Sequence, residues 1–124
     1  MANNREVSIL IIDDEEPIRR LLALYLSEEY TCVTAASAEE GMALMAASSF
    51  NLVMTDIKMP NMTGLELIAK LRQELGNRTV PIVIISTKGE ETDIQRGMSL
   101  GANEYLLKPI STMRLKEVIT RLLG

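Results

Sequence analysis

The chain has 124 residues, of which 47% are hydrophobic and 24% charged, and its formal net charge is -4. This length suits one domain with a single core, over residues 1–124, and the acidic balance gives no support to nucleic-acid binding. The single cysteine, Cys32, excludes a disulfide or a cysteine metal site within the chain. Without a signal peptide or an apolar run long enough to span a bilayer, we expect a cytoplasmic protein that does not bind membranes.

Apolar and amphipathic segments alternate through the first half of the chain. Residues 7–12 are apolar and rich in β-branched side chains, which predicts a strand, and residues 31–35 predict a second one. Between them Pro17 suits the first turn of a helix. A capping box starts the next helix, with Ser37 as the N-cap and Glu40 reaching back. The spacing predicts these inner positions for the two helices: Ile18, Leu21, Leu22 and Tyr25; then Ala38, Gly41, Met42 and Met45.

The second half continues the alternation. Residues 52–54 predict a strand buried on both faces, 80–85 a strand at the centre of the sheet, and 104–107 a short last strand. The helix between the first two ends at Gly76-Asn77, and a weaker helix over residues 91–100 contains Gly97. Ser111 caps a last helix. The inner positions predicted for these three helices are Leu67, Ile68, Leu71 and Leu75; Ile94 and Met98; and Leu115, Val118, Ile119 and Leu122.

Five strands alternating with five helices predict an α/β fold, a parallel sheet with helices on both faces and right-handed crossovers. Such sheets hold their functional groups on the loops that leave the carboxyl ends of the strands. A lone carboxylate there, such as Asp56, could simply cap a turn. Here, however, three carboxylates, two hydroxyls and an amine follow different strands and converge on one edge, and this favours a site. They are Asp13, Asp14, Asp56, Ser86, Thr87 and Lys108.

Three carboxylates that lie close together raise one another's pKa unless a cation lies among them. The chain has no His and its Cys is distant, so the oxygen ligands suit a hard cation, and we expect Mg²⁺. An amine and a hydroxyl beside a metal-bound carboxylate would bind an oxyanion such as a phosphoryl group.

Five short motifs of this chain are far more specific together than any one of them alone. They are Asp13-Asp14, the stretch from Leu52 through Asp56 to Met59-Pro60, Ser86-Thr87, the stretch from Gly101 to Tyr105, and Lys108-Pro109. With these motifs the chain, from Ile9 to the end of the last helix, resembles a response-regulator receiver domain of two-component signalling, of the single-domain, chemotaxis-regulator-like kind. The resemblance implies a flavodoxin-like, doubly wound five-stranded sheet of strand order 2-1-3-4-5.

The resemblance also implies roles for individual residues. Asp56 would be the phosphoacceptor, and Ser86 and Tyr105 would be the switch hydroxyl and the switch aromatic residue. Lys108, with Thr87, would contact the phosphoryl group, and the Lys108-Pro109 peptide would be cis. The Mg²⁺ ligands would be Asp13, Asp14, Asp56 and the backbone carbonyl of Lys58. Lys58 and Lys88 would flank the path of the water that hydrolyses the phosphoryl group.

The function that follows is phosphorelay signalling, in which a sensor histidine kinase or a phosphotransfer protein phosphorylates Asp56 in a Mg²⁺-dependent reaction. Because the chain has no His, the phosphohistidine must lie on that partner. Phosphorylation would switch a surface formed by the fourth helix, fifth strand and fifth helix, where a downstream protein binds. The chain would catalyse only its own phosphorylation and dephosphorylation, so we do not class it as an enzyme.

Two other readings stay open. The first is a pseudo-receiver, which binds its partner without being phosphorylated. The second is a phosphohydrolase with an aspartate nucleophile, a class that usually has a second acid where this chain has Lys58. Single residues also have plainer interpretations: Tyr105 as edge-strand core, and Glu15 and Glu16 as a solvated first helical turn favoured by the helix dipole.

Overall fold

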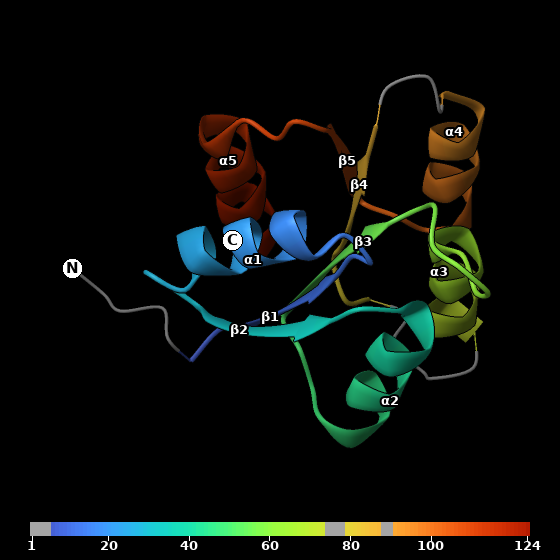
Figure 1. Cartoon of the computed structure of the whole chain (residues 1–124), viewed down its shortest axis with the longest axis horizontal. Coiled ribbons are helices and arrows are strands. Elements are labelled where there is room, and N and C mark those ends of the chain that lie inside the picture. Colours follow the sequence, from blue (N-terminus) through green and yellow to red (C-terminus); the bar gives the residue numbers. More distant parts are fainter. Residues whose placement is uncertain (1–5, 74–78, 88–90) are drawn as a thin grey trace.

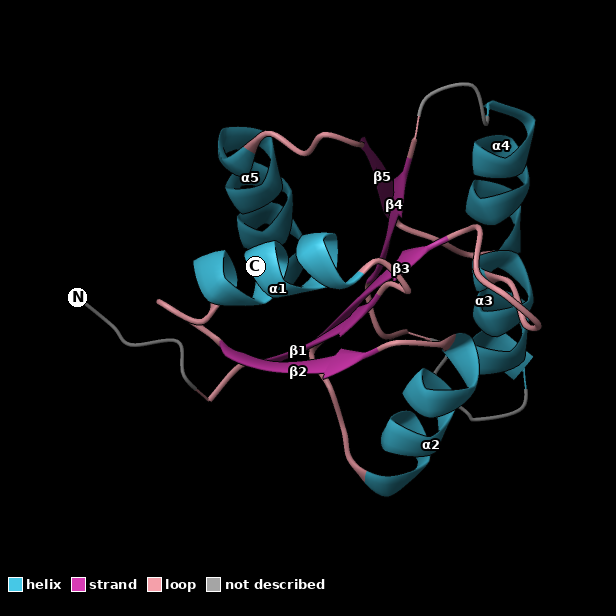
Figure 2. Cartoon of the chain, in the orientation of Figure 1, coloured by secondary structure: helices cyan, strands magenta, loops and turns pink. Residues whose placement is uncertain are grey.

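The computed structural model describes residues 6–73, 79–87 and 91–124, in which strands and helices alternate (Figure 1, Figure 2). In chain order the elements are β1 (Ser8–Ile12), α1 (Glu16–Leu26), β2 (Thr31–Ala35), α2 (Ala38–Ala47), β3 (Leu52–Asp56), α3 (Gly64–Gln73), β4 (Ile82–Ser86), α4 (Glu91–Leu100), β5 (Glu104–Leu107) and α5 (Thr112–Leu123). The strands pair in parallel in the order β2-β1-β3-β4-β5, which confirms the predicted flavodoxin-like topology.

The sheet separates two apolar clusters. Helices α1 and α5 cover one face, on the left in Figure 1, whereas α2, α3 and α4 cover the other. In β1 the side chains of Ile9 and Ile11 join the first cluster and those of Leu10 and Ile12 the second, because successive side chains of a strand point to opposite faces. The three central strands are buried on both faces, and this accounts for their nearly continuous apolar sequences.

Side chains of Ser and Thr cap the starts of α2, α3 and α5. Ser37 Oγ accepts a hydrogen bond from the N–H of Glu40, as predicted, while Glu40 Oε1 accepts one from Ala36 N at 2.6 Å. The same reciprocal arrangement starts α3, where Thr63 Oγ1 accepts from Glu66 N and Glu66 Oε1 from Thr63 N. The cap at α3 fixes where the loop after β3 turns into a helix.

One residue of α1, Leu21, was predicted from helical spacing to be buried, and this prediction is wrong. Leu21 is 63% exposed, and the residues that α1 buries are Leu22 and Leu26. The buried stripe of α1 is therefore narrower than predicted, because only α5 and the sheet cover this helix, on one side.

Helix α4 also faces the sheet differently from the prediction. Gly97 is buried against the sheet, whereas Met98 is 37% exposed. A Cβ atom at Gly97 would lie 2.3 Å from Ile84 Cδ1, so the missing side chain lets α4 pack closely on β4. The predicted end of α3, at Leu75 to Asn77, lies outside the described residues.

The C-terminal end of α4 is tied to α3 by one arginine. Arg72 Nη2 donates to the carbonyl oxygen of Gly101 at 2.7 Å and to Asn103 Oδ1 at 3.1 Å. Gly101 has a φ of 124°, a conformation that suits glycine. Asn103 Oδ1 also accepts from Ile82 N, so the same residues join α3, the end of α4 and the start of β4. Among the described helices none is both long and apolar enough to cross a membrane.

Candidate functional site

The carboxyl ends of β1, β3, β4 and β5 meet at one edge of the sheet, as predicted. Asp13 follows β1, Asp56 is the last residue of β3, Ser86 is the last residue of β4, and Lys108 follows β5. The strand register places Asp56 beside Ile85 and Ser86 beside Leu107. The backbone N–H of Lys108 donates to the carbonyl oxygen of Ser86 at 2.6 Å, which holds the lysine at this edge.

The ammonium group of Lys108 lies among three carboxylates. Its Nζ atom donates hydrogen bonds to Glu15 Oε1 at 2.7 Å and to Asp56 Oδ2 at 2.9 Å, and it lies 3.0 Å from Asp13 Oδ2. Burial alone would lower the pKa of Lys108, but the carboxylates of Glu15, Asp56 and Asp13 outweigh it and hold that pKa above its usual value. Lys108 is therefore a fixed positive charge at the centre of the site.

Asp13 is the most deeply placed acid. Its side chain is fully buried, and its backbone is held by a hydrogen bond from its N–H to Ala35 and by one that its carbonyl oxygen accepts from Arg19. Oδ1 accepts from Glu15 N at 2.9 Å, whereas the buried Oδ2 forms the ion pair with Lys108 and no hydrogen bond among the described residues. Burial raises the pKa of the Asp13 carboxyl, and the Glu15 N–H and Lys108 lower it only in part.

One carboxylate oxygen of Asp56 is bound by backbone N–H groups and the other by the Lys108 side chain. Oδ1 accepts from the backbone N–H of Ile57 at 2.7 Å and, at 3.4 Å, from that of Lys58. Oδ2 is bound by Lys108. The orientation of the carboxylate is therefore set by the backbone just after β3 and by a cation from the far side of the site.

Gly64 lies directly behind the main chain of Asp56. A Cβ atom at this position would lie 1.9 Å from the carbonyl oxygen of Asp56, and the Gly64 N–H donates to Ile57 O at 2.8 Å. The first residue of α3 thus packs backbone to backbone against the last residue of β3. Only a residue without a side chain fits here.

The residues present fit a divalent cation. Carboxylate oxygens of Asp13, Glu15 and Asp56 lie within 4.8 Å of one another, and the buried Asp13 Oδ2 lacks a hydrogen-bond partner among the described residues. Oxygen-only ligands of this charge are those that Mg²⁺ prefers. The excess of negative charge over the single ammonium group also favours a second cation at this edge.

The structure brings some predicted site residues together and leaves others apart. Ser86 is buried, and its Oγ donates to the carbonyl oxygen of Thr87 at 3.1 Å; the Thr87 side chain is exposed. Tyr105 is 39% exposed on β5. The predicted cis peptide between Lys108 and Pro109 is confirmed. Asp14 is exposed, and within the described part of the chain its carboxylate is not among the gathered acidic oxygens.

Of the two lysines predicted to flank the site, Lys58 is among the described residues. The side chain of Lys58 is exposed, and its backbone N–H faces Asp56. Lys88 lies outside the described residues.

Two contributors were not predicted. Glu15 was assigned to a solvated helical turn, yet it bonds Lys108 while its side chain stays 56% exposed. The available signal was its place two residues after the strand-end Asp13, whose Oδ1 accepts from the Glu15 N–H. Gly64 was not singled out, because no sequence pattern shows that another backbone lies against it.

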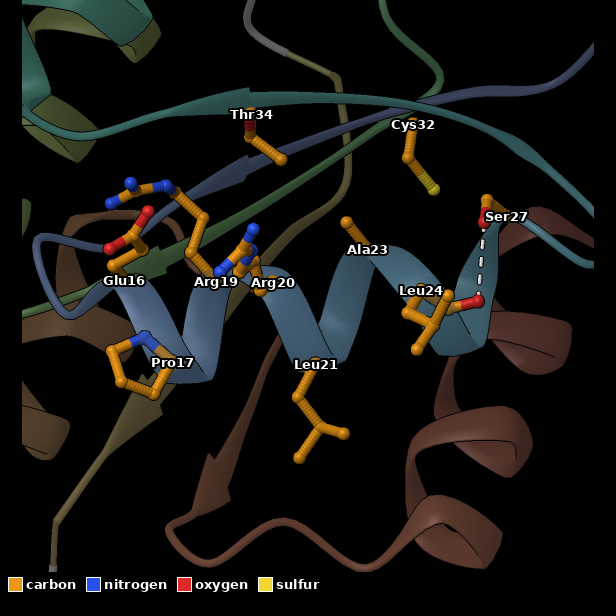
Figure 3. A pocket seen from close by; sticks show the side chains of 10 residues that line it. All are labelled: Glu16, Pro17, Arg19, Arg20, Leu21, Ala23, Leu24, Ser27, Cys32 and Thr34. Atoms are coloured by element: carbon orange, nitrogen blue, oxygen red, sulfur yellow. Dashed lines mark hydrogen bonds between the residues drawn. The ribbon is translucent and has the colours of Figure 1, made fainter.

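A separate open groove of about 720 Å³ lies between α1 and β2 (Figure 3). Arg20, Leu21 and Leu24 of α1 line it together with Cys32 of β2. Asp13, Glu15, Asp56 and Lys108 are not among its lining residues. The carboxylates and Lys108 instead occupy an edge of the sheet.

A family model and curated sequences both match this chain to response regulators. The family model for the response regulator receiver domain matches residues 9–120. The transcriptional regulatory protein ResD of Bacillus subtilis is 33% identical over 126 residues, which cover 98% of this chain and 51% of that protein. SrrA of Staphylococcus aureus is 36% identical over 118 residues, which cover 91% of this chain and 48% of that protein. The chain thus spans about half the length of these curated relatives.

Solved structures of similar proteins share the whole fold. The chemotaxis protein CheY4 of Vibrio cholerae is 28% identical and has a TM-score of 0.87, with 94% of this chain and 98% of that one covered. A response regulator receiver protein from Pseudomonas putida has the same identity and TM-score, over 98% of this chain and 99% of that one.

Proposed function

This chain belongs to the response regulator receiver domain family, and from that premise we propose that it accepts a phosphoryl group on Asp56 in a Mg²⁺-dependent reaction. It is a receiver domain of the kind found in two-component response regulators, which implies a role in phosphorelay signalling. The observation that carries the proposal is the contact of Lys108 Nζ with both Asp56 Oδ2, at 2.9 Å, and the buried Asp13 Oδ2, at 3.0 Å. It places a nucleophile, a fixed cation and a buried acidic oxygen together.

In the proposed reaction a carboxylate oxygen of Asp56 forms a bond to phosphorus while the bond to the donor's leaving group breaks, and that group keeps the electron pair. The backbone N–H groups of Ile57 and Lys58 orient the carboxylate. Lys108 neutralises charge on the phosphoryl oxygens. Mg²⁺, when bound, supplies further positive charge there. Asp13 and Asp56 would hold it, and Asp14 and the backbone carbonyl of Lys58 are the other ligands we propose.

Phosphorylation would then be transmitted to a surface. We assign the switch to Ser86, buried at the end of β4, and to Tyr105 on the neighbouring strand. The face formed by α4, β5 and α5 carries the exposed side chains of Met98, Tyr105 and Leu107, which suit a protein partner. The phosphoryl donor would be a histidine kinase or phosphotransfer protein in the cytoplasm. The chain would act only on its own aspartyl phosphate, without turnover of an external substrate.

The test is incubation with acetyl phosphate and Mg²⁺ followed by intact mass spectrometry. We expect one phosphoryl adduct on the wild type and none on Asp56→Asn, which is nearly isosteric and keeps the fold by circular dichroism. Asp93→Asn on α4 is the matched control and should be labelled like the wild type. Equal labelling of Asp56→Asn would refute the assignment. Absence of any adduct would favour the pseudo-receiver, and multiple turnover of acetyl phosphate would favour the hydrolase.

A further inference from the structure

The Lys108 ammonium group is already surrounded by carboxylates in this structure. Two of its three N–H donors form hydrogen bonds, to Glu15 and Asp56, and Asp13 Oδ2 lies 3.0 Å from the same nitrogen as an ion pair. A phosphoryl group on Asp56 would bring a further anionic oxygen to the same nitrogen. That oxygen would have to compete with these three carboxylates for the ammonium group.

The three partners differ in how easily they can leave. The side chain of Asp13 is fully buried and that of Asp56 is 10% exposed, so neither can move into water without a rearrangement of the sheet edge. The Glu15 side chain is 56% exposed and lies at the start of α1. Its carboxylate can rotate into solvent and be hydrated there, at little cost. Glu15 also makes the shortest of the three contacts, 2.7 Å.

From this difference, and resting on the proposed function, we propose that Glu15 is a displaceable partner of Lys108. Before phosphorylation its carboxylate occupies the place at the ammonium group that a phosphoryl oxygen takes afterwards. Glu15 thus competes with the phosphoryl group for Lys108 and sets how tightly the site binds it. In this role Glu15 tunes phosphoryl affinity through Lys108.

The neighbouring sequence offers matched variants. Glu15→Gln removes the charge and weakens the contact, whereas Glu15→Asp keeps the charge on a side chain one methylene shorter. Glu16→Gln makes the same charge change one residue along, on an exposed side chain in the first turn of α1. The probe is beryllium fluoride with Mg²⁺, a stable mimic of an aspartyl phosphate, and its affinity is measured by calorimetry. Mg²⁺ affinity alone is measured in parallel.

We expect Glu15→Gln and Glu15→Asp to bind beryllium fluoride about two- to fivefold more tightly than the wild type, the effect of losing one partly exposed ion pair. Glu16→Gln should match the wild type. Beryllium fluoride is titrated at saturating Mg²⁺, so that a change in Mg²⁺ affinity does not enter the comparison. The proposal is overturned if Glu15→Gln behaves like Glu16→Gln, or if Glu15→Asp behaves like the wild type. Failure of the wild type to bind beryllium fluoride would overturn the proposed function, and this inference with it.

Discussion

The close packing of Gly64 on Asp56 makes Gly64→Ala an informative perturbation. Real Cβ atoms essentially never approach another heavy atom closer than 3.0 Å, and an alanine here would place Cβ 1.9 Å from the Asp56 carbonyl oxygen. The two backbones must therefore separate by about 1 Å. Because both atoms belong to backbone, or are attached directly to it, no side-chain rotation can relieve the overlap.

Two effects of this substitution have opposite signs. Alanine is favoured over glycine in a helix by about 1 kcal/mol, so propensity alone predicts a more stable protein. Overpacking in a tightly packed interior costs about 1–3 kcal/mol, and the upper part of that range applies when backbone must move. We therefore expect Gly64→Ala to lower the free energy of unfolding by roughly 1–2 kcal/mol. We also expect slower labelling by acetyl phosphate, since the displaced residue carries the nucleophile.

Urea unfolding followed by circular dichroism measures the first effect, and intact mass spectrometry against time measures the second. Gly97→Ala is the matched control, because the Cβ atom there would meet the flexible end of the Ile84 side chain. It should cost less stability and leave labelling nearly unchanged. A Gly64→Ala protein as stable as the wild type, and labelled as fast, would refute the reasoning.

Three further predictions concern charge and reactivity. Replacing Asp56 with Asn should raise the metal-free free energy of unfolding by roughly 1 kcal/mol, because it relieves repulsion while Lys108 keeps two carboxylates; a lower melting temperature for the variant would contradict this. Lys58→Ala should shorten the half-life of the phosphoryl group, measured by phosphate release, because this lysine blocks the attacking water. Lys88→Ala, at a residue outside the described ranges, should do the same. Half-lives equal to or longer than that of the wild type would show that neither lysine blocks the water. Burial raises the pKa of the Cys32 thiol from 9.0 to about 11, so alkylation by iodoacetamide at pH 8 should be about a hundredfold slower in the native protein than in urea, and equal rates would show that the thiol is not protected.

The alternation of strands and helices was predictable because apolar and amphipathic segments alternate along the sequence. Buried central strands have nearly continuous apolar sequences, and right-handed crossovers place helices on both faces of such a sheet. The same rule brought Asp13, Asp56, Ser86 and Lys108 to one edge, since each follows a parallel strand. The strand order itself was implied by the family resemblance.

The failures have a common cause, which is that sequence spacing does not say what lies opposite a residue. Leu21 fits the period of α1, but its side is not covered. Met98 was preferred over Gly97 because it is apolar, whereas close packing on β4 selected the residue without a side chain. Glu15 was predicted to be a solvated acid, and its contact with Lys108 spans 93 positions of the chain, which no local pattern reveals.

The bond from Arg72 to Gly101 bears on how a signal could cross the molecule. It fastens the C-terminal end of α4 to α3, so we expect this helix to respond to a change at Ser86 by pivoting about Gly101 and not by sliding along the sheet. A pivot amplifies displacement with distance from the fulcrum. The first turn of α4, next to the site, would then travel farthest, while the junction with β5 stays still and keeps Tyr105 in register with Ile84.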